Sequence, residues 1–264
     1  MSALEVNSSN MKMFMSALEV KRNKNVEIAK ECLKDKKKLL YNLMSFFYIK
    51  QRKDDIAELI RDNSELVIID SGAHSFQFGK KVDWDSYTQE YANFIKKFDR
   101  PNVVGYFEMD VDNIIGYDKV LELRKVLESV SDKIIPVWHP NRGIDEYKKM
   151  CQDYHDKVIA IGGFRGTDIK DSQYLMFLKY AKKYNCKVHC LGMTRKDILD
   201  KIPFDFVDSS SWAQNAIYGR IVNKGKVSLE YSKKNRERCF VENYLQGMKM
   251  QEYYYQKWKK ECKD

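Results

Sequence analysis

Residues 66–110 read LVIIDSGAHSFQFGKKVDWDSYTQEYANFIKKFDRPNVVGYFEMD. Residues 66–70 and 103–110 are short apolar runs typical of buried strands, and residues 84–97 between them have the apolar spacing of a helix. Near-continuous apolar strands joined by a helical crossover indicate parallel pairing, because such strands are buried on both faces of their sheet. This stretch therefore predicts one β–α–β unit.

The same alternation continues in both directions along the chain. Six further apolar runs predict strands at residues 13–20, 39–48, 134–139, 158–162, 187–192 and 204–208. Segments with helical spacing lie between them at residues 26–33, 54–61, 118–129, 144–154, 172–184 and 195–201. Eight strand–helix units in about 200 residues predict an α/β fold, a closed (β/α)₈ TIM barrel, and an open doubly wound sheet is the alternative.

The 264 residues suit a single barrel domain with short additions at its two ends. Residues 1–10 are predicted to be a tail, since MSALEV occurs at 1–6 and again at 15–20. Residues 11–212 would form the catalytic barrel. Residues 213–264 are predicted to be a short basic, Tyr-rich C-terminal helical extension that packs on it.

Composition excludes several classes of protein. With 44% hydrophobic residues the chain can bury a core, so disorder is not expected. No apolar run approaches the ~20 residues of a membrane span, and the N-terminus lacks a signal segment, so we expect a cytoplasmic protein without a membrane partner. The six cysteines are scattered without a CxxC pair. We therefore expect reduced thiols, no metal and no cofactor.

Positive charge is concentrated in two segments. The formal net charge is +9 overall, with +6 in residues 213–264 and +5 in residues 21–38. A local excess of this kind is the electrostatic footprint of a nucleic acid, and solvated lysine-rich helices are the alternative. The residues predicted to contact phosphates are Arg220, Lys224, Lys226, Lys233, Lys234, Arg236 and Arg238. Tyrosines interleaved with lysines after residue 244 could stack on bases or pack on the barrel.

Polar residues follow the predicted strands at the points where these end. They include Glu19, Ser45, Asp70, Asp110, Asp112, His139, Gly192 and Asp208. In a parallel barrel these positions meet on one face, which carries the active site, although a single residue of this kind could simply cap the following helix. Two carboxylates that face a common centre can act as nucleophile and as acid/base at a glycosidic bond.

Five short segments, in order, resemble motifs of the tRNA-guanine transglycosylase superfamily. Residues 70–77 (DSGAHSFQ) are similar to its DSGG(F/Y)Q motif, and the acidic residues 107–110 (FEMD) follow on the next strand. Residues 161–164 (IGGF), 190–193 (CLGM) and 206–209 (FVDS) are similar to its (I/V)GG(L/F), LMGV and FDCV segments. The resemblance covers roughly residues 66–212.

The resemblance implies a role for each matching residue. Asp208 would be the nucleophile that attacks C1′ and holds the nucleoside covalently, Asp70 the general acid/base, and Asp110 the partner of the guanine N1–H and amino group. Gly162 and Gly163 would let backbone amides approach the base, between His74 and Leu191. The remaining predicted substrate-binding residues are Ser71, His139, Gly192 and Trp212, the last as a contact of an extruded base.

The departures from the family pattern narrow the expected substrate. The chain lacks the CxCxxC…H zinc subdomain of the tRNA enzymes, has Ala73 in place of a glycine, and continues after Asp208 with three serines and Trp212. These differences resemble the compact phage and bacterial relatives that act on DNA. They imply guanine exchange in DNA for a 7-deazaguanine base such as preQ0 or a derivative of it, in the host cytoplasm if the protein is phage-encoded.

Three alternatives remain at this point. The protein could exchange guanine in RNA, it could be a catalytically silent barrel that binds nucleic acid, or it could be a glycoside hydrolase. The three retained aspartates disfavour the second, and the positive charge disfavours the third. A homodimer is left open.

Overall fold

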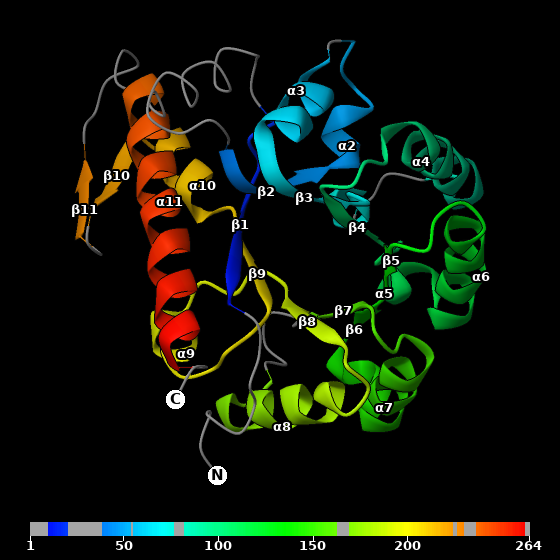
Figure 1. Ribbon diagram of the computed structural model, residues 1–264. Helices are drawn as coiled ribbons and strands as arrows, with labels where there is room; N and C mark the ends of the chain where they lie inside the picture. Colours follow the sequence, from blue (N-terminus) through cyan, green and yellow to red (C-terminus); the bar gives the residue numbers. More distant parts are fainter. Residues whose placement is uncertain are drawn as a thin grey trace.

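The computed structural model describes residues 10–20, 39–53, 55–76, 82–162, 169–223, 226–229 and 236–261. Within these ranges the chain forms the predicted α/β barrel, with a central ring of parallel strands surrounded by helices (Figure 1). The strands of the ring are β1 (Lys12–Ser16), β2 (Leu39–Ser45), β3 (Ser64–Asp70), β4 (Val103–Phe107), β5 (Ile134–Ile135), β6 (Val137–Trp138), β7 (Val158–Ile161), β8 (Lys187–Cys190) and β9 (Phe206–Ser209).

The ring closes through a strand that a proline divides in two. The hydrogen-bonded order is β5-β4-β3-β2-β1-β9-β8-β7-β6, and β5 and β6 are the two halves of the strand predicted at residues 134–139. Pro136 separates them because proline has no N–H to donate to a neighbouring strand. Its carbonyl oxygen still accepts the Ala160 N–H at 2.9 Å. If β5 and β6 are counted as one strand, the described strands therefore form an eight-stranded barrel.

The helices follow the strands around the outside of the ring. They are α2 (Phe46–Ile49), α3 (Ile56–Asn63), α4 (Trp84–Phe98), α5 (Asp112–Ile115), α6 (Tyr117–Glu128), α7 (Gly143–Asp153), α8 (Asp171–Lys182), α9 (Lys196–Leu199), α10 (Ser211–Ile217) and α11 (Arg236–Glu261). The helix predicted at residues 26–33 lies outside the described residues. None of the described helices is both long and apolar enough to cross a bilayer.

Both faces of the strands are buried, which explains their apolar sequences. Ile68 of β3 belongs to the cluster inside the barrel, together with Phe14 and Phe206. Its neighbours Val67 and Ile69 pack outward against the helices. Successive residues of a strand point to opposite faces, so a strand that is buried on both faces must be apolar at nearly every position. The polar residues are consequently confined to the strand ends.

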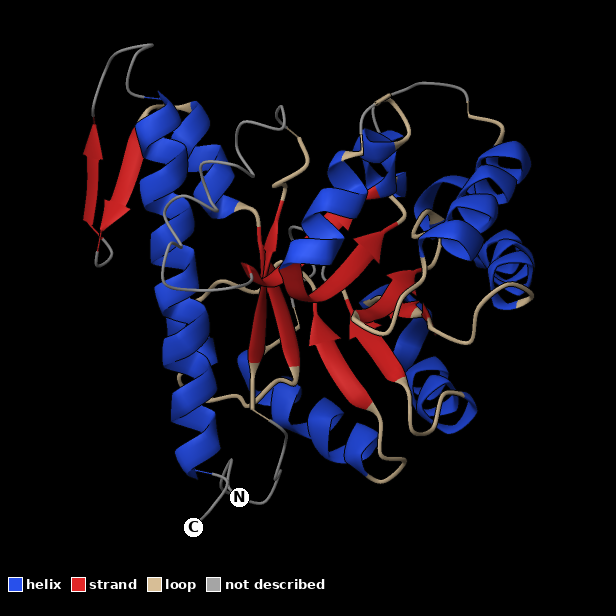
Figure 2. Cartoon of the chain, turned by 45° about the horizontal axis from the view of Figure 1, so that its top comes forward, coloured by secondary structure: helices blue, strands red, loops and turns tan. Residues whose placement is uncertain are grey.

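The C-terminal segment completes the barrel wall. A hairpin of β10 (Arg220–Asn223) and β11 (Lys226–Leu229), which the sequence did not predict, precedes the long helix α11. Helix α11 lies along β1 (Figure 2). It also bonds to β2, where Tyr244 donates to the Asn42 Oδ1 at 2.9 Å and Gln251 donates to the Tyr41 carbonyl at 3.0 Å. The predicted helical extension is therefore the helix that covers the junction between the last and the first strands.

Candidate active site

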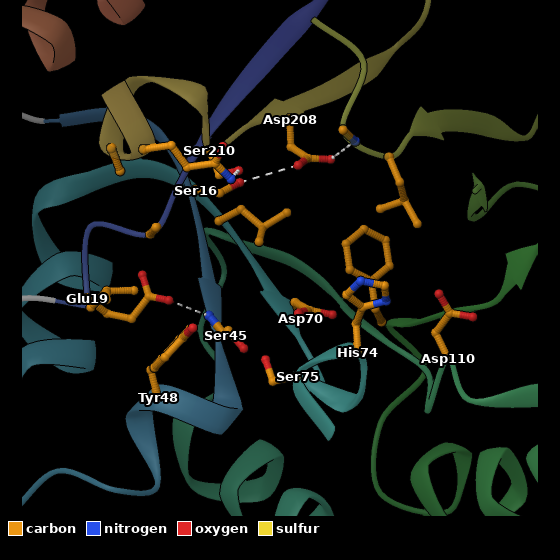
Figure 3. Close-up of a pocket in the computed structure, with 18 of the residues that line it drawn as sticks. Ser16, Glu19, Ser45, Tyr48, Asp70, His74, Ser75, Asp110, Asp208 and Ser210 are labelled. Carbon is orange, nitrogen blue, oxygen red and sulfur yellow. Dashed lines mark hydrogen bonds between the residues drawn. The ribbon is translucent and has the colours of Figure 1, made fainter. Parts of the chain in front are cut away.

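A cavity of about 650 Å³ opens where the strands end. Eight of the residues predicted from the sequence line it: Asp70, His74, Asp110, His139, Gly162, Leu191, Gly192 and Asp208. Figure 3 shows Asp208, Asp70 and Asp110 around one space. Asp208 lies in β9, Asp70 is the last residue of β3, and Asp110 follows β4. The structure thus brings the three predicted aspartates to the same end of the barrel.

Two predicted substrate-binding residues, Trp212 and Ser71, lie away from the cavity. Trp212 is 6% exposed, its indole N–H donates to the Ser16 carbonyl at 2.8 Å, and its ring packs on helix α11. Ser71 is fully buried, and its carbonyl accepts the Tyr87 hydroxyl at 2.7 Å. Neither residue lines the cavity. Their positions correspond to packing inside the fold, and Gly163 lies outside the described residues.

Asp208 is held by three donors. Its Oδ1 accepts hydrogen bonds from His189 Nε2 at 2.9 Å and from the Gly192 N–H at 2.8 Å. The Ser16 hydroxyl donates to its Oδ2 at 3.3 Å. Because these donors come from β8, the loop after it and β1, they fix the carboxylate relative to the rim. The side chain keeps 14% of its surface exposed toward the cavity.

Sequence reasoning missed His189 as a functional residue. Its imidazole is fully buried inside the barrel, in contact with the rings of Phe14, Phe107 and Phe206. A histidine enclosed by aromatic rings needs a polar partner, and Asp208 supplies it. The only signal in the sequence was an ionisable residue in the middle of an apolar strand. Because His189 does not line the cavity, it positions Asp208 without contacting a ligand.

Asp70 has a pKa raised to about 7. Burial is the main cause, since it disfavours the charged carboxylate, and the negative charges of Asp110 and Asp208 add to it. The Gly72 N–H opposes the shift by donating to the carboxylate. Near neutral pH this carboxyl group exchanges its proton readily, which is the property of a general acid/base.

The glycine after Asp70-Ser71 has a steric explanation. Gly72 adopts φ +74°, and a Cβ there would lie 2.4 Å from the Phe47 Cβ and 2.7 Å from the Phe47 nitrogen. Only glycine fits such a contact and such a backbone conformation. The third letter of the DSG motif is thus required to bring the end of β3 against the start of α2, with Asp70 facing the cavity.

Asp110 is paired with His139. The His139 Nε2 and the Asp110 Oδ1 are 2.6 Å apart. Burial favours the neutral imidazole, but the hydrogen bond and the charge of Asp110 outweigh it and raise the pKa of His139. A Cβ on Gly162 would lie 2.4 Å from the His139 ring, and the Gly162 N–H donates to the Trp138 carbonyl at 2.8 Å. The Gly162 N–H is therefore used within the barrel, while Gly162 itself lines the cavity as predicted.

The acidic neighbours of Asp110 form ion pairs behind the cavity. Glu108 is fully buried and accepts from Arg124 Nε and from the Val137 N–H, and Arg142 binds Asp112 at 2.9 Å. One ligand atom each of Asp110, Asp112 and His139 lies within 4.8 Å of the others, a spacing that a cation could use. However, the Arg142 guanidinium on Asp112 already supplies the positive charge there. These residues fit an ion-pair network better than a metal site.

The charge of the cavity is opposite to that of the whole protein. Its lining includes four carboxyl groups, those of Glu19, Asp70, Asp110 and Asp208. No lysine or arginine is among the described lining residues, although the chain as a whole carries a net charge of +9. Burial raises the pKa of Glu19 to about 7 as well. The described part of the lining therefore favours groups rich in N–H donors over phosphates.

The raised pKa values of Asp70 and Glu19 lead to a prediction about stability. Between pH 5 and pH 8 the folded state holds protons that the unfolded state has released, so the free energy of unfolding should fall as the pH rises through 7. In the double variant Asp70→Asn, Glu19→Gln this fall should be smaller, by about 5 kcal/mol over that interval, which is two pK units for each of the two groups. Thermal unfolding at both pH values measures it, and equal pH dependence in the two proteins would contradict it.

Comparison with known proteins adds information on the fold. No family profile matches the sequence, and no curated protein is significantly similar to it. Among solved structures, a mutant tryptophan synthase α-subunit from Pyrococcus furiosus superposes with a TM-score of 0.54 at 13% identity, over 91% of this chain and 98% of that one. A second mutant of the same subunit gives 0.49 at 13% identity, over 89% and 97%. At this identity the likeness supports the barrel fold alone.

Proposed function

We propose that the protein exchanges guanine in DNA for a 7-deazaguanine derivative, through a covalent bond between Asp208 and C1′ of the nucleotide. The observation that carries this proposal is the pairing of two unlike carboxyl groups in one cavity. Asp208 is oriented by three donors, and Asp70 has a pKa of about 7. This division suits a nucleophile and a separate proton carrier.

The exchange consists of two displacements at C1′. In the first, an Asp208 oxygen forms a bond to C1′ while the bond to guanine N9 breaks, and protonated Asp70 gives its proton to the departing base. In the second, the N9–H of the incoming base loses its proton to the Asp70 carboxylate, N9 bonds to C1′, and the bond to Asp208 breaks. A carboxyl group with a pKa near the working pH can serve both steps.

Asp110 supports the recognition of the base. Its carboxylate is partly exposed to the cavity while His139 holds one of its oxygens. A carboxylate can accept two parallel hydrogen bonds, from the N1–H and from the amino group of guanine. A purine without these two donors cannot form this pair of hydrogen bonds. His74 and Leu191 line the same cavity, consistent with contacts to the faces of the base.

Exposed side chains next to the cavity support the proposal that a nucleic acid strand binds there. Ile217 and Gln214 of α10 line it, and Tyr218 next to them is 67% exposed. The guanidinium of Arg220 lies 5.6 Å from the centre of the Tyr218 ring. An exposed aromatic ring beside a cation can stack on an unpaired base and bind its phosphate.

The other predicted phosphate contacts are described only in part. Arg238 on α11 is exposed and pairs with Glu242. Lys224, Lys233 and Lys234 lie outside the described residues. Lys226 and Arg236 are described only as backbone in β11 and α11.

The test of the function is the transfer of labelled guanine into a polymer. The protein is incubated with radiolabelled guanine and either duplex DNA, single-stranded DNA or tRNA, with Asp208→Asn as the inactive control. We expect label in DNA and none in tRNA. Label in tRNA alone would move the activity to RNA, and a failure to label any polymer would refute the proposal.

The role of the basic C-terminal segment can be tested by salt dependence. Replacing Lys233, Lys234, Arg236 and Arg238 with alanine should reduce the slope of log affinity against log salt, by about 0.9 for each phosphate that the variant no longer binds. The matched control replaces Lys148 and Lys149 on α7 and Lys182 and Lys183 at the C-terminal end of α8, none of which lines the cavity. Fluorescence anisotropy with a labelled oligonucleotide gives the slopes. If both variants behave alike, the segment makes no specific phosphate contacts.

A further inference from the structure

The exchange reaction leaves the three serines and the tryptophan after Asp208 without a role. They form the turn from β9 into α10, where the Ser209 and Ser211 hydroxyls lie 2.8 Å apart. The Ser209 hydroxyl also accepts the Ser211 N–H at 3.3 Å. This turn brings Trp212 to the end of β1, where its indole N–H donates to the Ser16 carbonyl at 2.8 Å.

Helix α11 holds Trp212 in this place. The Trp212 ring meets the rings of Phe240 and Tyr244 edge to face, at centroid distances of 5.9 and 5.1 Å. The side-chain amide of Asn243 donates to the Trp212 carbonyl at 3.2 Å. Because the ring is enclosed and the carbonyl is bonded, the indole N–H has one fixed direction, toward β1.

Ser16 connects this tryptophan to the proposed nucleophile. Its backbone carbonyl accepts the Trp212 indole N–H, while its hydroxyl donates to the Asp208 Oδ2 at 3.3 Å (Figure 3). The next residue, Ala17, lines the cavity with φ +75°, a left-handed conformation that a Cβ makes unfavourable. Such a conformation persists only where the surrounding contacts hold it, and the Trp212 bond holds the peptide group between Ser16 and Ala17. Without this bond the Ser16 hydroxyl is free to turn away from Asp208.

The two oxygens of the Asp208 carboxylate have different surroundings. Oδ1 accepts two short hydrogen bonds, from His189 Nε2 at 2.9 Å and from the Gly192 N–H at 2.8 Å. Among the described residues, Oδ2 has only the Ser16 hydroxyl at 3.3 Å, which is longer than a typical O–H···O hydrogen bond. A carboxylate oxygen has two acceptor sites, so both sites of Oδ1 are occupied while Oδ2 keeps one open. Oδ2 is therefore the oxygen that is available to form a new bond.

We propose that Asp208 attacks C1′ through Oδ2, and that Trp212 is the positioning residue that sets this oxygen through Ser16. The identity of the electrophile rests on the proposed function. As Oδ2 bonds to C1′, the electron pair of the bond between C1′ and guanine N9 leaves with the base, which takes its proton from Asp70. Oδ1 becomes the carbonyl oxygen of the ester and keeps its two donors. The same donors stabilise the carboxylate that departs in the second displacement.

The first experiment identifies the reacting oxygen without DNA or guanine. A small epoxide such as glycidol esterifies carboxylates: a carboxylate oxygen bonds to an epoxide carbon, the ring C–O bond breaks, and the alkoxide takes a proton from water. A crystal structure of the esterified protein should show the new bond on the Asp208 oxygen beside Ser16, with the Gly192 N–H still on the other oxygen. An ester on the oxygen that Gly192 binds would overturn the proposal. So would an Asp208 that stays unmodified while the exposed Asp145 reacts.

The second experiment removes only the indole N–H. Trp212→Phe keeps an aromatic ring beside α11, and Trp258→Phe is the matched control. Trp258 is 3% exposed, its indole N–H donates to the Leu199 carbonyl at 3.2 Å, and it does not line the cavity. Both variants should lose a similar amount of Tm. Only Trp212→Phe should slow ester formation by the epoxide at Asp208, by about threefold, and adduct formation with DNA, by about tenfold.

The Kd for the oligonucleotide should stay unchanged in both variants, since neither tryptophan lines the cavity. If Trp258→Phe slows the two reactions as much as Trp212→Phe does, the effect is a general loss of stability and the proposal is wrong.

A double variant shows whether Trp212 acts through Ser16. Ser16→Ala removes the hydroxyl that reaches Asp208, so Trp212→Phe should cause no further slowing of adduct formation in that background. Ser16→Thr keeps a hydroxyl at the same position and should retain most of the wild-type rate. If the Ser16→Ala and Trp212→Phe factors multiply in the double variant, Trp212 does not act through Ser16 and the proposed relay is refuted.

These outcomes separate the two proposals. If the epoxide bonds to Oδ2 and Trp212→Phe slows this reaction, but no polymer forms an adduct, the positioning of Asp208 stands and the proposed function fails. If the wild type and Trp212→Phe form the DNA adduct at the same rate, the proposed function stands and the positioning role of Trp212 is refuted.

Discussion

The Asp208→Asn variant should exchange bases slower than the wild type by a factor on the order of 10⁴ or more, because an amide oxygen does not displace a base from C1′. The covalent protein–DNA adduct should disappear with the activity. Three hydrogen-bond donors orient the Asp208 carboxylate toward the cavity. Glu108 and Asp112, the nearest alternatives in the sequence, are held in ion pairs with arginines.

The fold should survive this substitution. The amide oxygen of asparagine can accept from His189 Nε2 and the Gly192 N–H as the Oδ1 of Asp208 does, and its NH₂ group can donate to the Ser16 hydroxyl. The measurement is a denaturing gel of enzyme with labelled oligonucleotide, supported by thermal unfolding. Asp145→Asn, at an exposed carboxyl group on α7, is the control. Exchange by Asp208→Asn at the wild-type rate would show that the nucleophile is another residue.

The Asp70→Asn variant should lose about 10²- to 10⁴-fold in turnover, the usual contribution of a general acid/base. Its effect should also be visible in the pH dependence of the two half-reactions. In the wild type, adduct formation should slow above pH 7, since it needs the protonated acid. Transfer to the incoming base should slow below pH 7, since it needs the carboxylate.

Rapid-quench kinetics of the two half-reactions at pH 6 to 8 would measure these limbs. In Asp70→Asn both limbs should vanish, whereas a merely structural role of Asp70 would lower the rates and leave the pH profiles unchanged. The Asp110→Asn variant is a useful comparison, because it should weaken selection of guanine and keep both limbs of the pH profile. The limbs should move to lower pH, since the negative charge of Asp110 helps to raise the pKa of Asp70.

The barrel could be predicted from the sequence because its cause is local. Strands that are buried on both faces are apolar at consecutive positions, and an amphipathic helical segment follows each of them. The alternation of strands and helices is therefore visible in the sequence without any long-range information. The exceptions have other causes. Pro136 divides a strand without altering its apolar pattern. Helix α11 is so basic that its composition suggested an extension added to the barrel.

The site could be predicted as far as it depends on strand ends. Asp70, Asp110 and Asp208 follow apolar runs, and the closure of a parallel barrel brings such positions together. The partners of these residues could not be found in the same way. His189 resembles a packing residue in the sequence because it lies within a strand. Trp212 is buried with its indole N–H bonded to Ser16, 196 residues away in sequence.

The hydrogen bond from Ser16 to Asp208 joins the first strand of the barrel to the last, across 192 residues of sequence. Helix α11, which covers this junction, is made from still later residues, and its Tyr244 contacts Asn42 across 202 residues. Contacts of such sequence separation form late, because the entropy of closing a long loop must be overcome first. On the ribosome, Asp208 is synthesised after all three of its donors, so the complete cluster is present only once most of the described chain has been made. A nascent chain that stalls earlier holds Asp70 and Asp110 without Asp208, so under the proposed function it is not expected to react with DNA before folding is complete.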